Sequence, residues 1–103
     1  MSKSVRVAKV SQIADQSGLC VEAEGKRIAL FNVGGAFYAI DDTCTHQGGP
    51  LSEGTLDGQV VECPWHGARF NVVTGEATTP PAGANVVNYP VRVNGDDVEV
   101  ELP

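Results

Sequence analysis

Short runs of β-branched and aromatic residues, separated by turn-forming residues, constrain the fold of this chain more than any other feature. Twelve glycines and six prolines punctuate its 103 residues. No run keeps apolar residues at a helical period over three turns. The expected strands are 5–10, 19–23, 27–31, 36–40, 59–63, 68–72, 86–93 and 98–102. Many short strands at regular spacing predict an all-β fold, a small sandwich or barrel of antiparallel sheets.

The turns between these runs predict how neighbouring strands pair. The runs 19–23, 27–31 and 36–40 follow one another at hairpin spacing, so we expect an antiparallel meander. Asn94-Gly95 predicts a tight hairpin turn between the last two runs, because Asn and Gly tolerate a positive φ. A single helical turn is expected at residues 11–16. The expected loops are residues 41–58, 63–68 and 74–84.

Length and charge limit the domain organisation and the partners. A chain of this length fits one domain, residues 1–103. Its net charge of −6 argues against binding to nucleic acid and to anionic membrane surfaces, both of which need a basic face. No apolar run approaches the roughly 20 residues of a membrane-spanning helix. The N-terminus has no signal-peptide apolar stretch, so we expect a cytoplasmic protein.

The charge is unevenly distributed along the chain. Residues 1–40 hold five bases and three acids, a net +2, whereas residues 41–103 hold two bases and ten acids, a net −8. Residues 41–84 have a net charge of −5, from Arg69 and six acids: Asp41, Asp42, Glu53, Asp57, Glu62 and Glu76. The first two also fit a simpler role, ending the strand and capping the loop before Cys44. Two interpretations stay open: an acidic surface that only keeps the protein in solution, and an acidic docking rim that steers weak, fast encounters with basic partners.

Both histidines of the chain lie within three residues of a cysteine, in two predicted loops. The first loop holds Cys44-Thr45-His46 and the second holds Cys63-Pro64-Trp65-His66, with sixteen residues between the two motifs. Scattered core residues would not pair in this way twice, so the pattern predicts that Cys44, His46, Cys63 and His66 bind metal.

The order of the ligands favours a cluster over a single ion. Zinc modules usually take two like ligands from each short motif, whereas each motif here supplies one sulfur and one nitrogen. That order suits a binuclear centre in which each loop gives its Cys to one iron and its His to the other, as in a Rieske [2Fe–2S] centre. A structural zinc module remains the alternative from a different class.

On these residues the sequence resembles the Rieske iron–sulfur family along essentially its whole length. The matching residues are Cys44-Thr45-His46 with Gly48, Cys63-Pro64-Trp65-His66-Gly67, Arg69-Phe70, Thr74-Gly75 and the proline loop Pro80-Pro81-Ala82. The resemblance implies a single domain of stacked antiparallel sheets with the cluster-binding loops at one tip. It also implies that the proline loop covers the cluster.

Three departures point to one branch of that family. The Rieske proteins of cytochrome bc complexes carry an additional cysteine in each loop, and a disulfide joins the two. The corresponding positions of this chain are Gly49 and Trp65. The serine that they place after the second histidine is Ala68 here. The membrane anchor is also missing. These features resemble the soluble ferredoxins of bacterial ring-hydroxylating oxygenase systems, which function in the catabolism of aromatic hydrocarbons.

The resemblance implies an electron carrier and not an enzyme. The expected protein is a monomer that passes single electrons from an NAD(P)H-dependent flavoprotein reductase to a terminal oxygenase of the dioxygenase type. The alternative within redox biology is a small Rieske subunit held permanently in an oxidase or reductase complex. With both histidines used as ligands, no Ser/His/Asp set or second iron site can be built from the remaining residues.

The sequence also supports predictions for two further residues, Cys20 and Trp65. Cys20 lies between Leu19 and Val21 in a predicted strand, with no histidine beside it, and is expected to be an inert thiol without a role. Trp65 lies between two expected ligands, where it should shield the cluster from water and offer an apolar contact to a redox partner.

Overall fold

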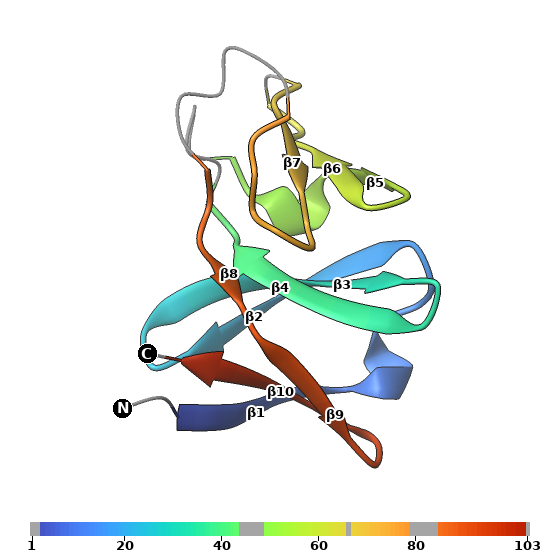
Figure 1. Ribbon diagram of the computed structural model, residues 1–103, viewed down its shortest axis with the longest axis vertical. Helices are drawn as coiled ribbons and strands as arrows, with labels where there is room; N and C mark the ends of the chain where they lie inside the picture. Colours follow the sequence, from blue (N-terminus) through green and yellow to red (C-terminus); the bar gives the residue numbers. More distant parts are fainter. Residues whose placement is uncertain (1–2, 44–48, 66, 79–84, 103) are drawn as a thin grey trace.

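Three antiparallel sheets stack along the longest axis of the molecule (Figure 1). The computed structural model describes residues 3–43, 49–65, 67–78 and 85–102. The base sheet has the order β1-β10-β9, the central sheet β2-β3-β4-β8, and the small sheet β5-β6-β7. Base sheet and small sheet lie at opposite ends in Figure 1. The all-β fold is confirmed: the described residues form strands and two short 3-10 turns, with no α-helix.

The central sheet separates two hydrophobic cores. Its members are β2 (Ser17–Ala23), β3 (Lys26–Val33), β4 (Ala36–Asp41) and β8 (Asn88–Tyr89). Successive side chains of a strand point to opposite faces of the sheet. In β3, Ile28 and Leu30 therefore enter one core while Ala29 and Phe31 enter the other, and all four are fully buried. This two-sided burial makes the central sheet a firm support for both ends of the molecule.

The base sheet closes the first core. It consists of β1 (Lys3–Lys9), β9 (Val91–Asn94) and β10 (Asp97–Leu102). β10 alternates half-buried and buried residues, and its Val98, Val100 and Leu102 pack against the central sheet. A 3-10 turn at Val10–Gln12 connects β1 to the central sheet.

The small sheet closes the second core and carries the second predicted motif. We call the small sheet, the 3-10 turn η2 (Leu51–Glu53) and residues 72–78, which return along β7, the lobe; its strands are β5 (Thr55–Asp57), β6 (Val60–Glu62) and β7 (Arg69–Asn71). Leu51, Val61 and Phe70 are fully buried against Phe31 and Ile40 of the central sheet. The lobe is thus fixed to the central sheet through a continuous apolar core, which we expect to stabilise it.

Most strand predictions are confirmed, including the β2-β3-β4 meander with its antiparallel register. The single strand expected at 86–93 is wrong: Pro90 divides it into β8 of the central sheet and β9 of the base sheet. Proline has no N–H to donate to a strand ladder, so the chain changes sheets there.

Three boundary predictions also need correction. The last hairpin turn is Gly95-Asp96, one residue later than expected, because Asn94 still pairs with Asp97. The helical turn is a 3-10 turn that ends at Gln12. The long loop expected at 41–58 contains η2 and the three-residue strand β5, which pairs with β6. No helix in the described part of the chain has the length and apolar character needed to cross a membrane.

Candidate metal centre

The structure describes one of the four predicted ligands, Cys63. It follows β6 directly and begins the second motif loop, residues 63–68. Cys44, His46 and His66 lie outside the described residues, as does the expected proline loop Pro80-Pro81-Ala82. The surroundings of Cys63 and the described ends of the loops therefore carry the structural argument for a metal centre.

Cys63 is held in a tight, buried turn. Its side chain is only 1% exposed and belongs to the second core. Its N–H donates to the carbonyl of Ala68 at 2.7 Å, and its own carbonyl accepts from the N–H of Gly67 at 3.2 Å. The two strands β6 and β7 thus bring the start and the end of the second motif loop together and fix the sulfur between them.

The first motif loop, residues 43–50, ends directly against this sulfur. A Cβ added to Gly49 would lie 2.8 Å from Cys63 Sγ and 3.0 Å from Trp65 Cγ, which is closer than carbon atoms can pack. Only glycine allows the backbone of one motif loop to approach the cysteine of the other so closely. The described residues therefore fit a metal centre that is shared between the two loops, with the Cys63 sulfur as a donor of the type a [2Fe–2S] cluster takes.

Trp65 lies across the same contact. Its ring carbons are within 3.1 Å of the position that a Gly49 Cβ would take, while the residue as a whole is 58% exposed. One part of the indole thus packs on the first motif loop and the rest faces solvent. Both roles expected from the sequence, shielding and an apolar contact surface, are compatible with this placement.

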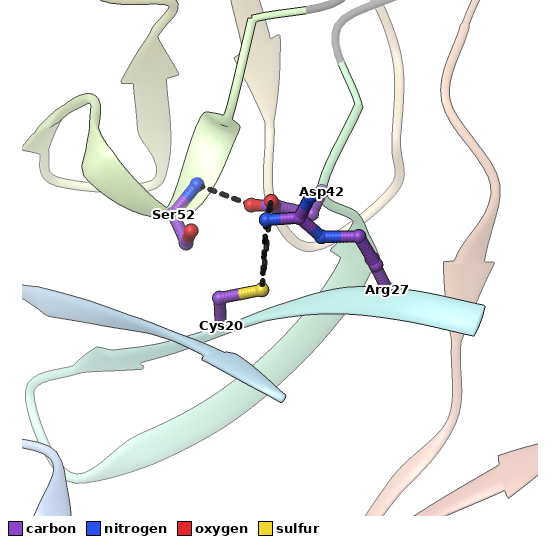
Figure 2. A network of polar contacts seen from close by, with 4 residues as sticks. All are labelled: Cys20, Arg27, Asp42 and Ser52. Atoms are coloured by element: carbon purple, nitrogen blue, oxygen red, sulfur yellow. Dashed lines mark hydrogen bonds and ion pairs between the residues drawn. The ribbon is translucent and has the colours of Figure 1, made fainter. Parts of the chain in front are cut away.

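Asp42 joins the two ends of the first motif loop. It follows β4, is 2% exposed, and its Oδ1 accepts the N–H of Ser52 at 2.8 Å. Its carbonyl accepts the N–H of Leu51 at 2.6 Å. Its Oδ2 lies 3.5 Å from the Cys20 thiol and 3.7 Å from the Arg27 guanidinium (Figure 2). The buried carboxylate is thus paired and hydrogen-bonded, as burial of a charge requires.

Asp41 and Gly75 hold the third loop, residues 74–84, at its two ends. The Tyr89 hydroxyl donates to Asp41 Oδ1 at 2.5 Å, and the Asp41 N–H donates to the carbonyl of Val87 at 2.9 Å. Burial of the Tyr89 hydroxyl raises its pKa, and the hydrogen bond to the Asp41 carboxylate raises this pKa further. The phenol therefore stays protonated and remains the donor. The Val86 N–H donates to the carbonyl of Gly75 at 2.9 Å.

The sequence left two interpretations open for Asp41 and Asp42, a cap on the loop and a part of the acidic rim; for Asp42 the cap is confirmed and the rim is wrong. A carboxylate that is 2% exposed offers no charge to a partner. On the lobe, Glu53, Asp57 and Glu76 are exposed, while Glu62 pairs with Arg69 at 3.0 Å. The signal for the capping role was the place of Asp42 between a buried strand and the first motif, where loop ends need hydrogen-bond partners.

Three comparisons with known proteins agree on one family. The family model described as the Rieske [2Fe-2S] domain matches residues 3–90. The ferredoxin component of the naphthalene 1,2-dioxygenase system of Pseudomonas aeruginosa is 39% identical over 100 residues, 97% of this chain and 96% of the relative. The 3-phenylpropionate/cinnamic acid dioxygenase ferredoxin subunit of Shigella boydii serotype 4 (strain Sb227) is 52% identical over 77 residues, 74% of this chain and 73% of the relative.

A solved structure supports the fold. It is described as the complex of reduced oxygenase and oxidized ferredoxin in carbazole 1,9a-dioxygenase, and one of its chains matches with a TM-score of 0.88 and 40% identity. The match covers 94% of this chain and 91% of that chain. The expected Rieske-type arrangement of sheets is thereby confirmed. The chain belongs to the Rieske [2Fe-2S] domain family and is an electron-transfer ferredoxin with a Rieske-type cluster, not itself a catalyst.

Proposed function

We propose that Cys44, His46, Cys63 and His66 hold the cluster, with the two cysteines on one iron and the two histidines on the other. The observation that carries this assignment is the contact of Gly49 with Cys63, because it joins the end of the first motif loop to the ligand of the second. The bound cluster supplies one-electron exchange. The described residues bury the Cys63 side chain and leave part of the Trp65 indole at the surface.

The chain passes single electrons from an NAD(P)H-dependent flavoprotein reductase to a terminal oxygenase of the dioxygenase type. The relatives that support this role are named as ferredoxin components of dioxygenase systems. The structure from carbazole 1,9a-dioxygenase pairs a ferredoxin with its oxygenase. Aromatic compounds such as those in these names are the class of oxygenase substrate that we assign to the system. We propose a cytoplasmic location, because the NAD(P)H that such a reductase oxidises is found there.

The chain acts as a monomeric shuttle and not as a permanent subunit. A permanent subunit needs a large apolar interface. Among the described residues, the large hydrophobic side chains that are exposed are Trp65, Val87 and Val93, which come from the second motif loop, the segment before β8 and the base sheet. Dispersed residues of this kind favour weak, short-lived contacts.

Metal analysis of the purified protein tests the ligand assignment. Two irons and two acid-labile sulfides per chain, with a red-brown colour, are expected. Replacing Cys44, His46, Cys63 or His66 by Ala, one at a time, should abolish the stable cluster, whereas Cys20→Ala should keep the full visible spectrum. Colourless protein with one zinc would refute the cluster, and loss of the spectrum in Cys20→Ala with its retention in Cys44→Ala would refute the ligand set.

A further inference from the structure

Asp42 connects the rigid central sheet to both ends of the first motif loop. Its N–H donates to the carbonyl of Arg27 at 3.1 Å, which continues the pairing of β4 with β3. Its carbonyl and its Oδ1 accept the N–H groups of Leu51 and Ser52. This one residue, directly after β4, therefore fixes the start of the loop by its backbone and the end of the loop by two hydrogen bonds.

The remaining oxygen of Asp42 is also fixed. Oδ2 accepts the Cys20 thiol at 3.5 Å and faces the Arg27 guanidinium at 3.7 Å, with both partners on neighbouring strands of the central sheet (Figure 2). These contacts leave the carboxylate no freedom to rotate away from Ser52. A bridge between Thr43 and Pro50 lies next to this contact and brings the loop ends together.

We propose that Asp42 is the positioning residue of the metal centre: by holding both ends of residues 43–50 to the central sheet, it sets where Cys44 and His46 stand relative to Cys63. Cys44 comes two residues after Asp42, so a shift of the loop ends is passed directly to this ligand. Holding the ends of the loop together before the cluster binds also removes conformations in which the ligands are far apart. The inference rests on the proposed assignment of Cys44 and His46 as ligands.

The competing explanation is that Asp42 only stabilises the fold, as any buried polar residue does. Asn32 provides the matched control for it. It is 8% exposed, its side-chain amide donates to the carbonyl of Ile13 at 2.9 Å, and its Oδ1 accepts the N–H of Gly35 at 2.8 Å. Its side chain thus bonds two backbone groups, as that of a buried polar residue should, one in the following turn and one in a distant segment, and neither group is part of the motif loops.

The test compares Asp42→Ala with Asn32→Ala in the cluster-loaded protein. We measure the EPR g values of the reduced cluster and the rate of iron release to a chelator, well below the melting temperature of each variant. Asp42→Ala should release iron at least about tenfold faster than the unmodified protein, a factor that corresponds to about 1.4 kcal/mol, and should shift the g values. Asn32→Ala should lower the melting temperature and leave both cluster readouts unchanged.

Two conservative variants separate position from charge, and they decide the question even where Asp42→Ala does not fold. Asp42→Asn keeps an oxygen at the position that accepts from Ser52 and can donate its amide to the Cys20 sulfur. It should retain g values and iron release close to those of the unmodified protein. Asp42→Glu keeps the charge but moves the carboxylate out by one methylene, so it should shift the g values and speed iron release.

Two results would overturn the inference. Asp42→Glu could behave like the unmodified protein while Asp42→Asn is impaired, in which case charge and not position matters. Alternatively, all Asp42 variants could match Asn32→Ala in iron release and g values, which would reduce Asp42 to support of the fold. Failure of the ligand assignment would be recognised separately, because Cys44→Ala would then retain the cluster.

Discussion

At the scale of single residues, Cys20 illustrates what a sequence can and cannot reveal. Its place between Leu19 and Val21 identified it correctly as a strand residue of β2. Its contact with Asp42 depends on the pairing of three strands and had no local signal. Burial raises the pKa of the Cys20 thiol, while the nearby Arg27 opposes the shift. The thiol is therefore neutral at physiological pH and a poor metal ligand or nucleophile.

The first prediction concerns the reactivity of Cys20. Because the folded protein disfavours its thiolate, iodoacetamide should alkylate Cys20 of the cluster-loaded protein more slowly than free cysteine near neutral pH. The rate should rise as the pH is increased into the alkaline range, since deprotonation then produces the nucleophile. Mass spectrometry of the modified peptide measures this rate, and Cys20→Ala is the blank. Equal rates at neutral and alkaline pH would contradict the prediction.

The second prediction concerns Ala68. This residue is 1% exposed, and its carbonyl accepts the N–H of Cys63, so its methyl group stands where a serine would place a hydroxyl beside the ligand loop. Without that donor we expect a midpoint potential on the order of −150 mV, the lower end of the Rieske range. Ala68→Ser should raise the potential by roughly 40 mV, because about 1 kcal/mol of hydrogen bonding to the reduced centre corresponds to this shift in a one-electron couple.

Protein-film voltammetry checks this value. Ala8→Ser is the control, since Ala8 is a buried alanine of the base sheet that lies in the other core. It should weaken the fold and leave the potential unchanged. An unchanged potential in Ala68→Ser, with an intact cluster, would mean that the introduced hydroxyl bonds elsewhere.

At the scale of elements, local sequence patterns predicted the pairing of strands that follow one another in the chain. β2, β3 and β4 alternate with glycine turns, so both their pairing and their order follow from the sequence. The pairing of β1 with β10 and of β4 with β8 joins segments far apart in the chain, and no turn spacing indicates it. β5 has only three residues and gains its strand form from pairing with β6, so its sequence alone looked like loop.

The same distinction applies to the candidate site. The two motifs predict four ligands from spacing and residue type, and three of the four lie outside the described residues. The residues that hold the loop ends, Asp42, Gly49 and Gly75, act through contacts with segments that are distant in sequence. A single sequence gives no measure of such contacts, so these roles required the structure.

The third prediction concerns the third loop. Gly75 has a φ of 82°, and an added Cβ would lie 2.3 Å from the carbonyl oxygen of Val86. Gly95 has a similar φ of 64° but nothing within 4 Å of its added Cβ. Both Ala variants bear the left-handed backbone cost of about 1–2 kcal/mol, but only Gly75→Ala must also displace Val86, at a further cost of roughly 1–3 kcal/mol.

Thermal unfolding of the two variants separates these costs. Each 1 kcal/mol corresponds to roughly 4–8 °C in the melting temperature of a domain of this size. Gly75→Ala should therefore melt at a clearly lower temperature than Gly95→Ala. Equal melting temperatures would show that the contact with Val86 relaxes without cost.

At the scale of the whole molecule, the net negative charge lies at the end that carries Cys63, because the acids of the base sheet are balanced by basic residues. The lobe and the base sheet lie at opposite ends of an axis 38 Å long (Figure 1). Two basic residues of the base sheet, Arg6 and Lys9, both face Asp97 at 3.8 Å, and Lys3 pairs with Glu24. On the lobe, the exposed Glu53, Asp57 and Glu76 have no ion-pair partner among the described residues. We therefore expect a basic partner to be attracted to the lobe end.

The last prediction follows from this separation. Salt shortens the reach of exposed charges to about 10 Å at 0.1 M and about 3 Å at 1 M, so electron transfer between the chain and its reductase or oxygenase should slow as salt rises. Steered encounters of this kind lose roughly tenfold or more in rate.

A triple variant of the lobe tests where the steering charge lies; its changes are Glu53→Gln, Asp57→Asn and Glu76→Gln. Electron transfer to or from this variant should be slower at low salt and should depend less on salt. The matched control removes the same charge from the base sheet and its turn, by Asp96→Asn, Glu99→Gln and Glu101→Gln. Because the base lies several screening lengths from the lobe, the control should keep nearly the full salt dependence of the unmodified protein. Stopped-flow reduction at several salt concentrations measures all three proteins. If both triple variants lose the salt dependence equally, net charge alone governs the encounter; if the rate does not change with salt at all, Trp65→Ala becomes the decisive test of an apolar docking contact.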